Sequence, residues 1–113
     1  MPIEKFVDDN KERFLEELKE LLKFPSISSL SEHKSDLTDC AVWLKDHLDR
    51  IGLENTEIIP TEGHPVVYAD WLHAEGAPTL MVYGHYDVQP VDPLELWDSP
   101  PFEPVVKGDS IYG

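Results

Sequence analysis

One short stretch of the chain pairs a histidine with an aspartate at a spacing that can support hydrolytic chemistry. His85 and Asp87 stand two residues apart, directly after the apolar run 79–83 and Gly84. In an extended segment, residues i and i+2 project to the same side, so both side chains can face one cavity. A neutral imidazole is a good zinc ligand, and a nearby carboxylate can fix its tautomer. The same two residue types also occur in the triads of serine hydrolases.

The elements expected around this pair are two helices followed by strands. Apolar residues recur at helical spacing in 4–23 and in 36–51, with Ser35 or Asp36 suited to the second N-cap and Gly52 to its C-cap. Runs of strand-forming residues between turn residues predict strands at 55–59, 66–72, 79–84, 105–107 and 110–112. We therefore expect an α/β fold with two helices packed on a mixed β-sheet.

This arrangement would give the His-x-Asp pair a defined place. If 79–84 is a buried strand, His85 and Asp87 lie at its carboxyl end, where open α/β sheets bind their ligands. The proline-rich stretch 90–104 that follows predicts an irregular but ordered loop, anchored to the body of the protein by Trp97 and Phe102.

The composition excludes several classes of partner. The 113 residues carry 9 Lys+Arg against 23 Asp+Glu, a formal net charge of −14. Because so acidic a surface repels phosphates, we expect no nucleic-acid partner and no membrane partner. No apolar run approaches the ~20 residues of a membrane span, and the start of the chain has no secretory signal pattern. With a single cysteine, Cys40, these features predict a cytoplasmic location.

Four segments of the sequence occur together, in the same order, in one enzyme family. They read Phe24-Pro25-Ser26-Ile27-Ser28, then Tyr83-Gly84-His85-Tyr86-Asp87-Val88-Gln89-Pro90, then Trp97-Asp98-Ser99-Pro100-Pro101-Phe102-Glu103-Pro104, and finally Gly108-Asp109-Ser110-Ile111-Tyr112-Gly113. With these segments the chain resembles the amino-terminal part of the aminoacylase/carnosinase/desuccinylase family of dinuclear zinc metallopeptidases. The Val-Gln-Pro run that follows Asp87 is similar to the sequence at the same place in the dipeptidases of that family.

The resemblance implies a chemical role for each member of the pair. His85 would be a ligand of one of two zinc ions, for which cobalt or manganese can substitute, and Asp87 would be the carboxylate counted as catalytic. The two ions would share a water and polarise the scissile carbonyl of a short peptide, and a glutamate would take the proton from that water. The implied fold of the whole catalytic domain is a three-layer α/β/α sandwich.

The other ligands and the general base that this chemistry needs do not match any motif in the sequence. We therefore expect residues 1–113 to be the amino-terminal part of the catalytic domain of a longer dipeptidase, which also has a dimerisation or lid domain and forms a homodimer. By itself the chain should be inactive and bind zinc weakly, although Asp92 or Asp98 can complete a loose site. An exposed sheet edge should make it self-associate.

Other interpretations stay open at this point. The chain can be an acidic interaction or regulatory domain that has the peptidase-like fold without catalysis, or part of an amidase or deacylase of the same family. His85 can also be an ordinary histidine at a strand end. A Ser-His-Asp hydrolase is disfavoured, because the sequence contains no Gly-x-Ser-x-Gly.

Overall fold

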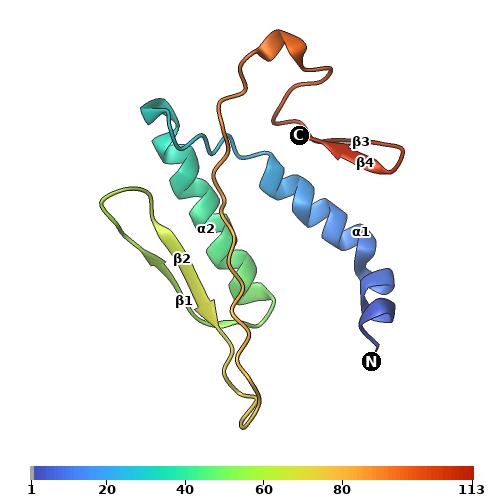
Figure 1. Cartoon of the computed structure of the whole chain (residues 1–113), viewed down its shortest axis with the longest axis vertical. Coiled ribbons are helices and arrows are strands. Elements are labelled where there is room, and N and C mark those ends of the chain that lie inside the picture. The colour runs from blue at the N-terminus through green and yellow to red at the C-terminus, as the bar shows by residue number, and fades with distance from the viewer. Residues whose placement is uncertain (1) are drawn as a thin grey trace. The chain divides into compact units, whose positions relative to one another are not determined.

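The structure is a computed structural model that describes residues 2–113 (Figure 1). Its elements, in order, are α1 (Ile3–Leu22), the 3-10 turn η1 (Ser31–His33), α2 (Lys34–Arg50), β1 (Glu54–Ile59), β2 (Val66–Asp70), the 3-10 turn η2 (Leu94–Leu96), β3 (Val105–Lys107) and β4 (Ser110–Tyr112). The chain divides into two compact units. One combines the segment up to Phe24 with Val91–Gly113, and the other is Pro25–Pro90.

The expected α/β class and both helices are confirmed, but the sheet differs from the expectation. The strands form two separate antiparallel pairs, β1 with β2 and β3 with β4, rather than one mixed sheet. Each pair is a hairpin, in which a short connection joins two strands that are neighbours in the sequence. Among residues 2–113, no helix has the length and apolar character needed to cross a membrane.

The unit Pro25–Pro90 is built on the packing of α2 against the β1–β2 hairpin (Figure 1). Leu37, Cys40 and Ala41 are buried and follow one another at i, i+3 and i+4, so they share one face of the helix. Ile27, from the segment before the helix, is also buried. These four residues are the hydrophobic core of the unit.

The N-cap expected for α2 is wrong, whereas its C-terminus is as expected. The helix begins earlier, at Lys34, because η1 leads directly into it, and the N-cap position is His33 without a side-chain cap. Asp36 lies in the first turn and pairs instead with the His33 ring, with 2.8 Å between Oδ2 and Nδ1. At the other end, Gly52 has φ +97°, the left-handed conformation in which glycine commonly ends a helix.

The strand expected at 79–84 does not form, and this is the main correction to the sequence-based fold. These residues run extended, without a strand partner among residues 2–113. The side chains of Leu80, Met81, Val82 and Tyr83 are between 84% and 87% exposed rather than buried. Their apolar and β-branched character favours a strand, but a strand also needs a neighbour for its N–H and C=O groups.

The other unit contains α1, the proline-rich loop and the β3–β4 hairpin. α1 is amphipathic, and no residue of it is buried. In the loop, the Trp97 indole Nε1 donates a 3.0 Å hydrogen bond to the Val91 carbonyl oxygen, a contact that lies within the loop itself and does not test the expected anchoring to the body. Gly108 turns the hairpin with φ +60°, a conformation that L side chains rarely adopt.

Candidate metal-binding and catalytic site

His85 and Asp87 lie on the same side of an extended segment, as their spacing predicts. The His85 Nδ1 atom is 2.9 Å from Asp87 Oδ1 and 3.0 Å from the Asp87 carbonyl oxygen. The His85 side chain is 74% exposed and that of Asp87 43% exposed. The pair is therefore preorganised but open to solvent, so the remaining face of the imidazole is accessible to a ligand.

The partners of His85 determine which ring nitrogen carries the proton when the imidazole is neutral. A carbonyl oxygen can only accept a hydrogen bond, and so can an ionised carboxylate. Both neighbours of Nδ1 are of this kind, so Nδ1 is the donor. The lone pair of the neutral ring then lies on Nε2, which is free to bind a metal ion.

The second oxygen of the Asp87 carboxylate is held by a residue far away in the sequence. The Ser28 hydroxyl donates a hydrogen bond of 2.6 Å to Asp87 Oδ2. One carboxylate oxygen thus accepts a hydrogen bond from the serine hydroxyl, and the other accepts one from the histidine ring. The order in space is Ser28–Asp87–His85, whereas a serine hydrolase triad places the histidine between the serine and the aspartate. Ser28 is therefore not placed as a nucleophile that His85 could activate.

These contacts keep Asp87 ionised. The Ser28 hydrogen bond lowers the pKa of the Asp87 carboxyl below its usual value, and the hydrogen bond and positive charge of a protonated His85 lower it further, while partial burial opposes them. Hydrogen bonds donated to the charged form of an acid always act in this direction. An ionised Asp87 is what the donor assignment at His85 Nδ1 requires.

The backbone around Asp87 is fixed by the segment that carries Ser28. Ile27 and Val88 form a parallel bridge, and the Val88 N–H donates a hydrogen bond of 2.9 Å to the Ser26 carbonyl oxygen. The Ser26 hydroxyl donates a hydrogen bond of 2.7 Å to the Tyr86 carbonyl oxygen. Because Ser26 and Ile27 are 2% and 3% exposed, this support for the site is firmly packed.

Sequence reasoning found His85 and Asp87 but missed Ser26 and Ser28 as supporting residues. Both serines entered the sequence analysis only as part of the family resemblance. A signal was present in the alternation Ser26-Ile27-Ser28, which is typical of an extended segment with a polar and an apolar side. What the alternation cannot show is which distant segment lies opposite, so the partner Asp87 came only from the structure.

One of the residues present can serve as a zinc ligand, but the residues do not form a complete zinc site. A catalytic zinc ion normally takes three protein ligands and keeps one open position. No group of three or more His, Cys, Asp and Glu side chains that could hold a metal ion is found in the described range 2–113. Asp92 and Asp98 belong to the other compact unit. His85, held by Asp87, is therefore a candidate for one such ligand.

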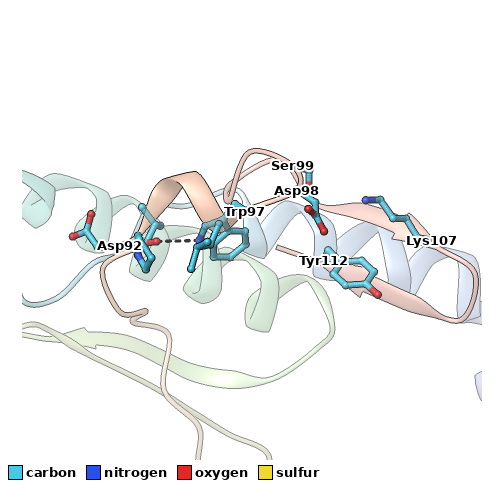
Figure 2. Close-up of a pocket in the computed structure, with 9 residues that line it drawn as sticks. Asp92, Trp97, Asp98, Ser99, Lys107 and Tyr112 are labelled. Atoms are coloured by element: carbon cyan, nitrogen blue, oxygen red, sulfur yellow. Dashed lines mark hydrogen bonds between the residues drawn. The ribbon is translucent and has the colours of Figure 1, made fainter.

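A pocket of about 240 Å³ lies in the unit that contains the proline-rich loop. Its lining includes Trp97 and Asp98 from the loop and Lys107 and Tyr112 from the β3–β4 hairpin (Figure 2). The Lys107 ammonium lies 5.5 Å from the centre of the Tyr112 ring, a cation–π contact within the lining itself. Its lining contains two carboxylates, those of Asp92 and Asp98, which are fewer than the three protein ligands that a catalytic zinc ion normally takes.

Comparisons with known proteins relate the chain to part of several hydrolases. No family model matches the chain. A cysteinylglycine-S-conjugate dipeptidase from Corynebacterium striatum is 30% identical over 104 residues, which are 92% of this chain and 23% of that protein. A succinyl-diaminopimelate desuccinylase from Bordetella pertussis is 34% identical over 99 residues, which are 88% of this chain and 24% of that protein. The chain is homologous to part of these hydrolases.

A solved structure supports the same relationship. A dipeptidase from Saccharomyces cerevisiae matches with a TM-score of 0.81 and 27% identity over 89% of this chain and 23% of that one. The resemblance to the dipeptidase and desuccinylase family is thereby confirmed. The chain spans about a quarter of the length of the curated relatives it matches.

Proposed function

We propose that residues 1–113 are the amino-terminal part of the catalytic domain of a zinc-dependent dipeptidase. The observation that carries the proposal is the Ser28–Asp87–His85 arrangement, which keeps the proton on Nδ1 and leaves the Nε2 lone pair of an exposed imidazole free for a metal ion. Homology to a dipeptidase and a desuccinylase supports hydrolysis of an amide bond. Two zinc ions are proposed for the whole enzyme, with cobalt or manganese as substitutes.

In this proposal each residue of the pair has a distinct task. His85 binds through Nε2, and Asp87 accepts the Nδ1 hydrogen, which fixes the ring orientation and raises the basicity of the ligand. Bound zinc supplies a Lewis acid that polarises the scissile carbonyl and lowers the pKa of a bound water. Asp87 acts on the reaction through His85, since both its oxygens are already engaged.

The proposed substrates are dipeptides with a free amino end. The dipeptidase relatives and the Val-Gln-Pro after Asp87 favour this class. The second candidate is an amidase or deacylase, which the 34% identity to a desuccinylase favours. The two differ on the acyl side of the scissile amide bond, which carries a free α-amino group in a dipeptide and none in an N-acetyl or N-succinyl amino acid.

The chain by itself is proposed to be inactive, because it offers one metal ligand and no general base next to it. The remaining ligands, the base and a dimerisation or lid domain are proposed to lie in further parts of a homodimeric parent, which we place in the cytoplasm. An acidic regulatory domain without catalysis is the alternative from another class, and the net charge of −14 is compatible with it.

The test is made on the longest reading frame that contains these residues. The purified protein is assayed with a panel of dipeptides and with N-acetyl and N-succinyl amino acids, before and after removal of metal with a chelator. We expect dipeptide hydrolysis that is lost with the chelator, restored by zinc, and abolished in His85→Ala. His73→Ala is the matched control, because His73 is also exposed and paired with a carboxylate, at 2.7 Å from Glu54.

Each other outcome points to a different interpretation. Cleavage of the acylated substrates alone would identify a deacylase instead of a dipeptidase. The absence of any hydrolysis in zinc-loaded, folded protein would favour the regulatory domain. Full activity of His85→Ala would refute the assignment of His85 as a metal ligand.

A further inference from the structure

We infer that Ser28 is a positioning residue that fixes the tautomer of His85 through Asp87, an inference that rests on the proposed function of His85. The three residues form a continuous chain of hydrogen bonds from Ser28 Oγ to Asp87 Oδ2 at 2.6 Å and from Asp87 Oδ1 to His85 Nδ1 at 2.9 Å. Neither the position of Ser28 in the sequence nor its residue type identifies this role.

Ser28 limits how the Asp87 carboxylate can rotate. With a donor on each oxygen, rotation of the carboxylate breaks both hydrogen bonds at once. Without the serine hydroxyl, one oxygen is free, and solvent competes for the group because its side chain is 43% exposed. The hydrogen bond to His85 Nδ1 then weakens, and the imidazole no longer has a strong preference for keeping its proton on that atom.

Ser28 is itself held in place from a third segment of the chain. The His64 ring lies with Nε2 at 2.9 Å from the Ser28 carbonyl oxygen, and because that oxygen can only accept, Nε2 is the donor. Ile27, next to it, is buried in the core. The serine hydroxyl therefore reaches Asp87 from a backbone that is fixed on both sides, which a positioning residue requires.

Ser26 offers a control that distinguishes a positioning role of Ser28 from general support of the loop. It is the same residue type in the same segment, but its hydroxyl donates to the Tyr86 backbone carbonyl rather than to the Asp87 carboxylate. If Ser28 acted only by holding the two segments together, substitution of either serine would have the same effect on His85. If Ser28 orients Asp87, substitution of Ser28 alone changes the tautomer.

The experiment measures the tautomer directly in the metal-free 113-residue chain. Histidines are labelled with ¹⁵N, and long-range ¹H–¹⁵N correlation spectra are recorded at increasing pH until the His85 signals no longer change, so that the neutral ring is observed. In the wild type we expect His85 to be protonated mainly on Nδ1. In Ser28→Ala we expect a smaller fraction of Nδ1–H, because the Asp87 carbonyl oxygen at 3.0 Å is then the one acceptor that stays firmly placed, while Ser28→Thr restores the wild-type pattern and Ser26→Ala leaves it unchanged.

Several results would overturn the inference. One is a wild-type His85 protonated mainly on Nε2, which needs no variant at all. Another is a folded Ser28→Ala chain with the wild-type tautomer, and a third is Ser26→Ala with the same change as Ser28→Ala. If Ser28→Ala does not fold, the comparison is made with Ser28→Cys, whose weaker donor should produce an intermediate preference, and an unchanged tautomer there would equally contradict the role.

A zinc titration of the same samples keeps this inference separate from the proposed function. If zinc shifts the Nε2 resonance of wild-type His85 and does so less at equal concentration in Ser28→Ala, both are supported. If zinc leaves Nε2 unaffected while the tautomer responds to Ser28 as expected, the role of Ser28 stands and the proposed metal ligand fails. If zinc binds Nε2 equally in both proteins and the tautomer is also unchanged, Ser28 has no positioning role.

Discussion

The backbone N–H of Val88 donates a hydrogen bond of 2.9 Å to the carbonyl oxygen of Ser26, joining two distant segments of the chain. This contact, with the parallel bridge between Ile27 and Val88, determines where the His-x-Asp pair lies. The segment before the pair, 79–83, is exposed and pairs with no strand of the described chain. The site is thus positioned by the turn that follows α1 rather than by a sheet.

The first prediction concerns Asp87 in a longer protein that contains the whole site. We expect Asp87→Asn to keep most of the bound metal and to reduce turnover by about 10- to 100-fold, the usual effect of removing a residue that orients a metal ligand. The amide can present an N–H₂ group to His85 Nδ1, which then loses its acceptor. Turnover of dipeptides and metal content by atomic absorption are measured together.

Asp39→Asn is the matched control for that experiment. Asp39 is an exposed aspartate on α2, and its substitution by asparagine removes the same charge from the protein. It should leave both turnover and metal content unchanged. Equal turnover of the Asp87→Asn and wild-type enzymes would show that the orienting role assigned to Asp87 is wrong.

The second prediction concerns the core of the unit Pro25–Pro90. Leu37 is 1% exposed, so Leu37→Ala should lower the free energy of unfolding by about 2–5 kcal/mol. Leu72→Ala removes the same atoms from a side chain that is 64% exposed, and it should change this free energy by less than about 0.5 kcal/mol. Urea unfolding followed by circular dichroism measures both.

A small domain can lose its fold entirely with such a change, since total stabilities are only about 5–15 kcal/mol. Leu37→Met is the milder variant for that case, with an expected cost below about 1.5 kcal/mol. A similar stability for Leu37→Ala and Leu72→Ala would contradict the packing of α2 described above.

The third prediction follows from the burial of Cys40. Burial raises the pKa of the thiol to about 11, from an ordinary value of 9.0, although a hydrogen bond with Ser26 opposes the change. Between these two pH values the unfolded state binds fewer protons than the folded state. The free energy of unfolding therefore falls as the pH rises from about 9 to about 11, by at most about 3 kcal/mol, because each pKa unit corresponds to about 1.4 kcal/mol.

The measurement compares wild type with Cys40→Ala over this pH range. Other groups titrate there too, so the expected result is the difference, with a steeper decrease of stability in the wild type. The native thiol should also react slowly with a disulfide reagent at pH 8 and rapidly in urea. Fast labelling of the native chain at pH 8 would show that Cys40 is not buried as described.

The fourth prediction concerns self-association through residues 79–83. Their side chains form an exposed apolar run with unpaired backbone groups, a combination that favours pairing with another chain. We expect light scattering to show oligomers whose fraction rises with protein concentration and with salt, which screens the net charge of −14. Val82→Lys should shift the protein toward the monomer.

Leu96→Lys is the control for this substitution, because Leu96 is also an exposed apolar residue but lies in η2 and outside the run. It adds the same charge and should not change the oligomeric state. Wild-type protein that stays monomeric at high concentration and high salt would be evidence against pairing through 79–83.

Much of the local structure was determined by the sequence itself. The helical spacing of apolar residues predicted α1 and α2 to within a few residues, since the amphipathic pattern of a helix is local. The strands that form the two hairpins were also predicted, because strand-forming residues between turn residues such as Gly108 are a local signal. His85 and Asp87 were recognisable because their spacing places both on one side of an extended chain.

Only the tertiary structure decided what lies opposite these residues. Strand propensity at 79–84 is a property of the side chains, whereas a strand forms only where another backbone satisfies its hydrogen-bonding groups, and residues 2–113 provide none there. Likewise, no local pattern pairs Ser28 with Asp87, because their contact depends on how the segment before α2 packs beside residues 86–88. The chemistry of the candidate site is therefore readable in the sequence, but its support is long-range and is visible only in the fold.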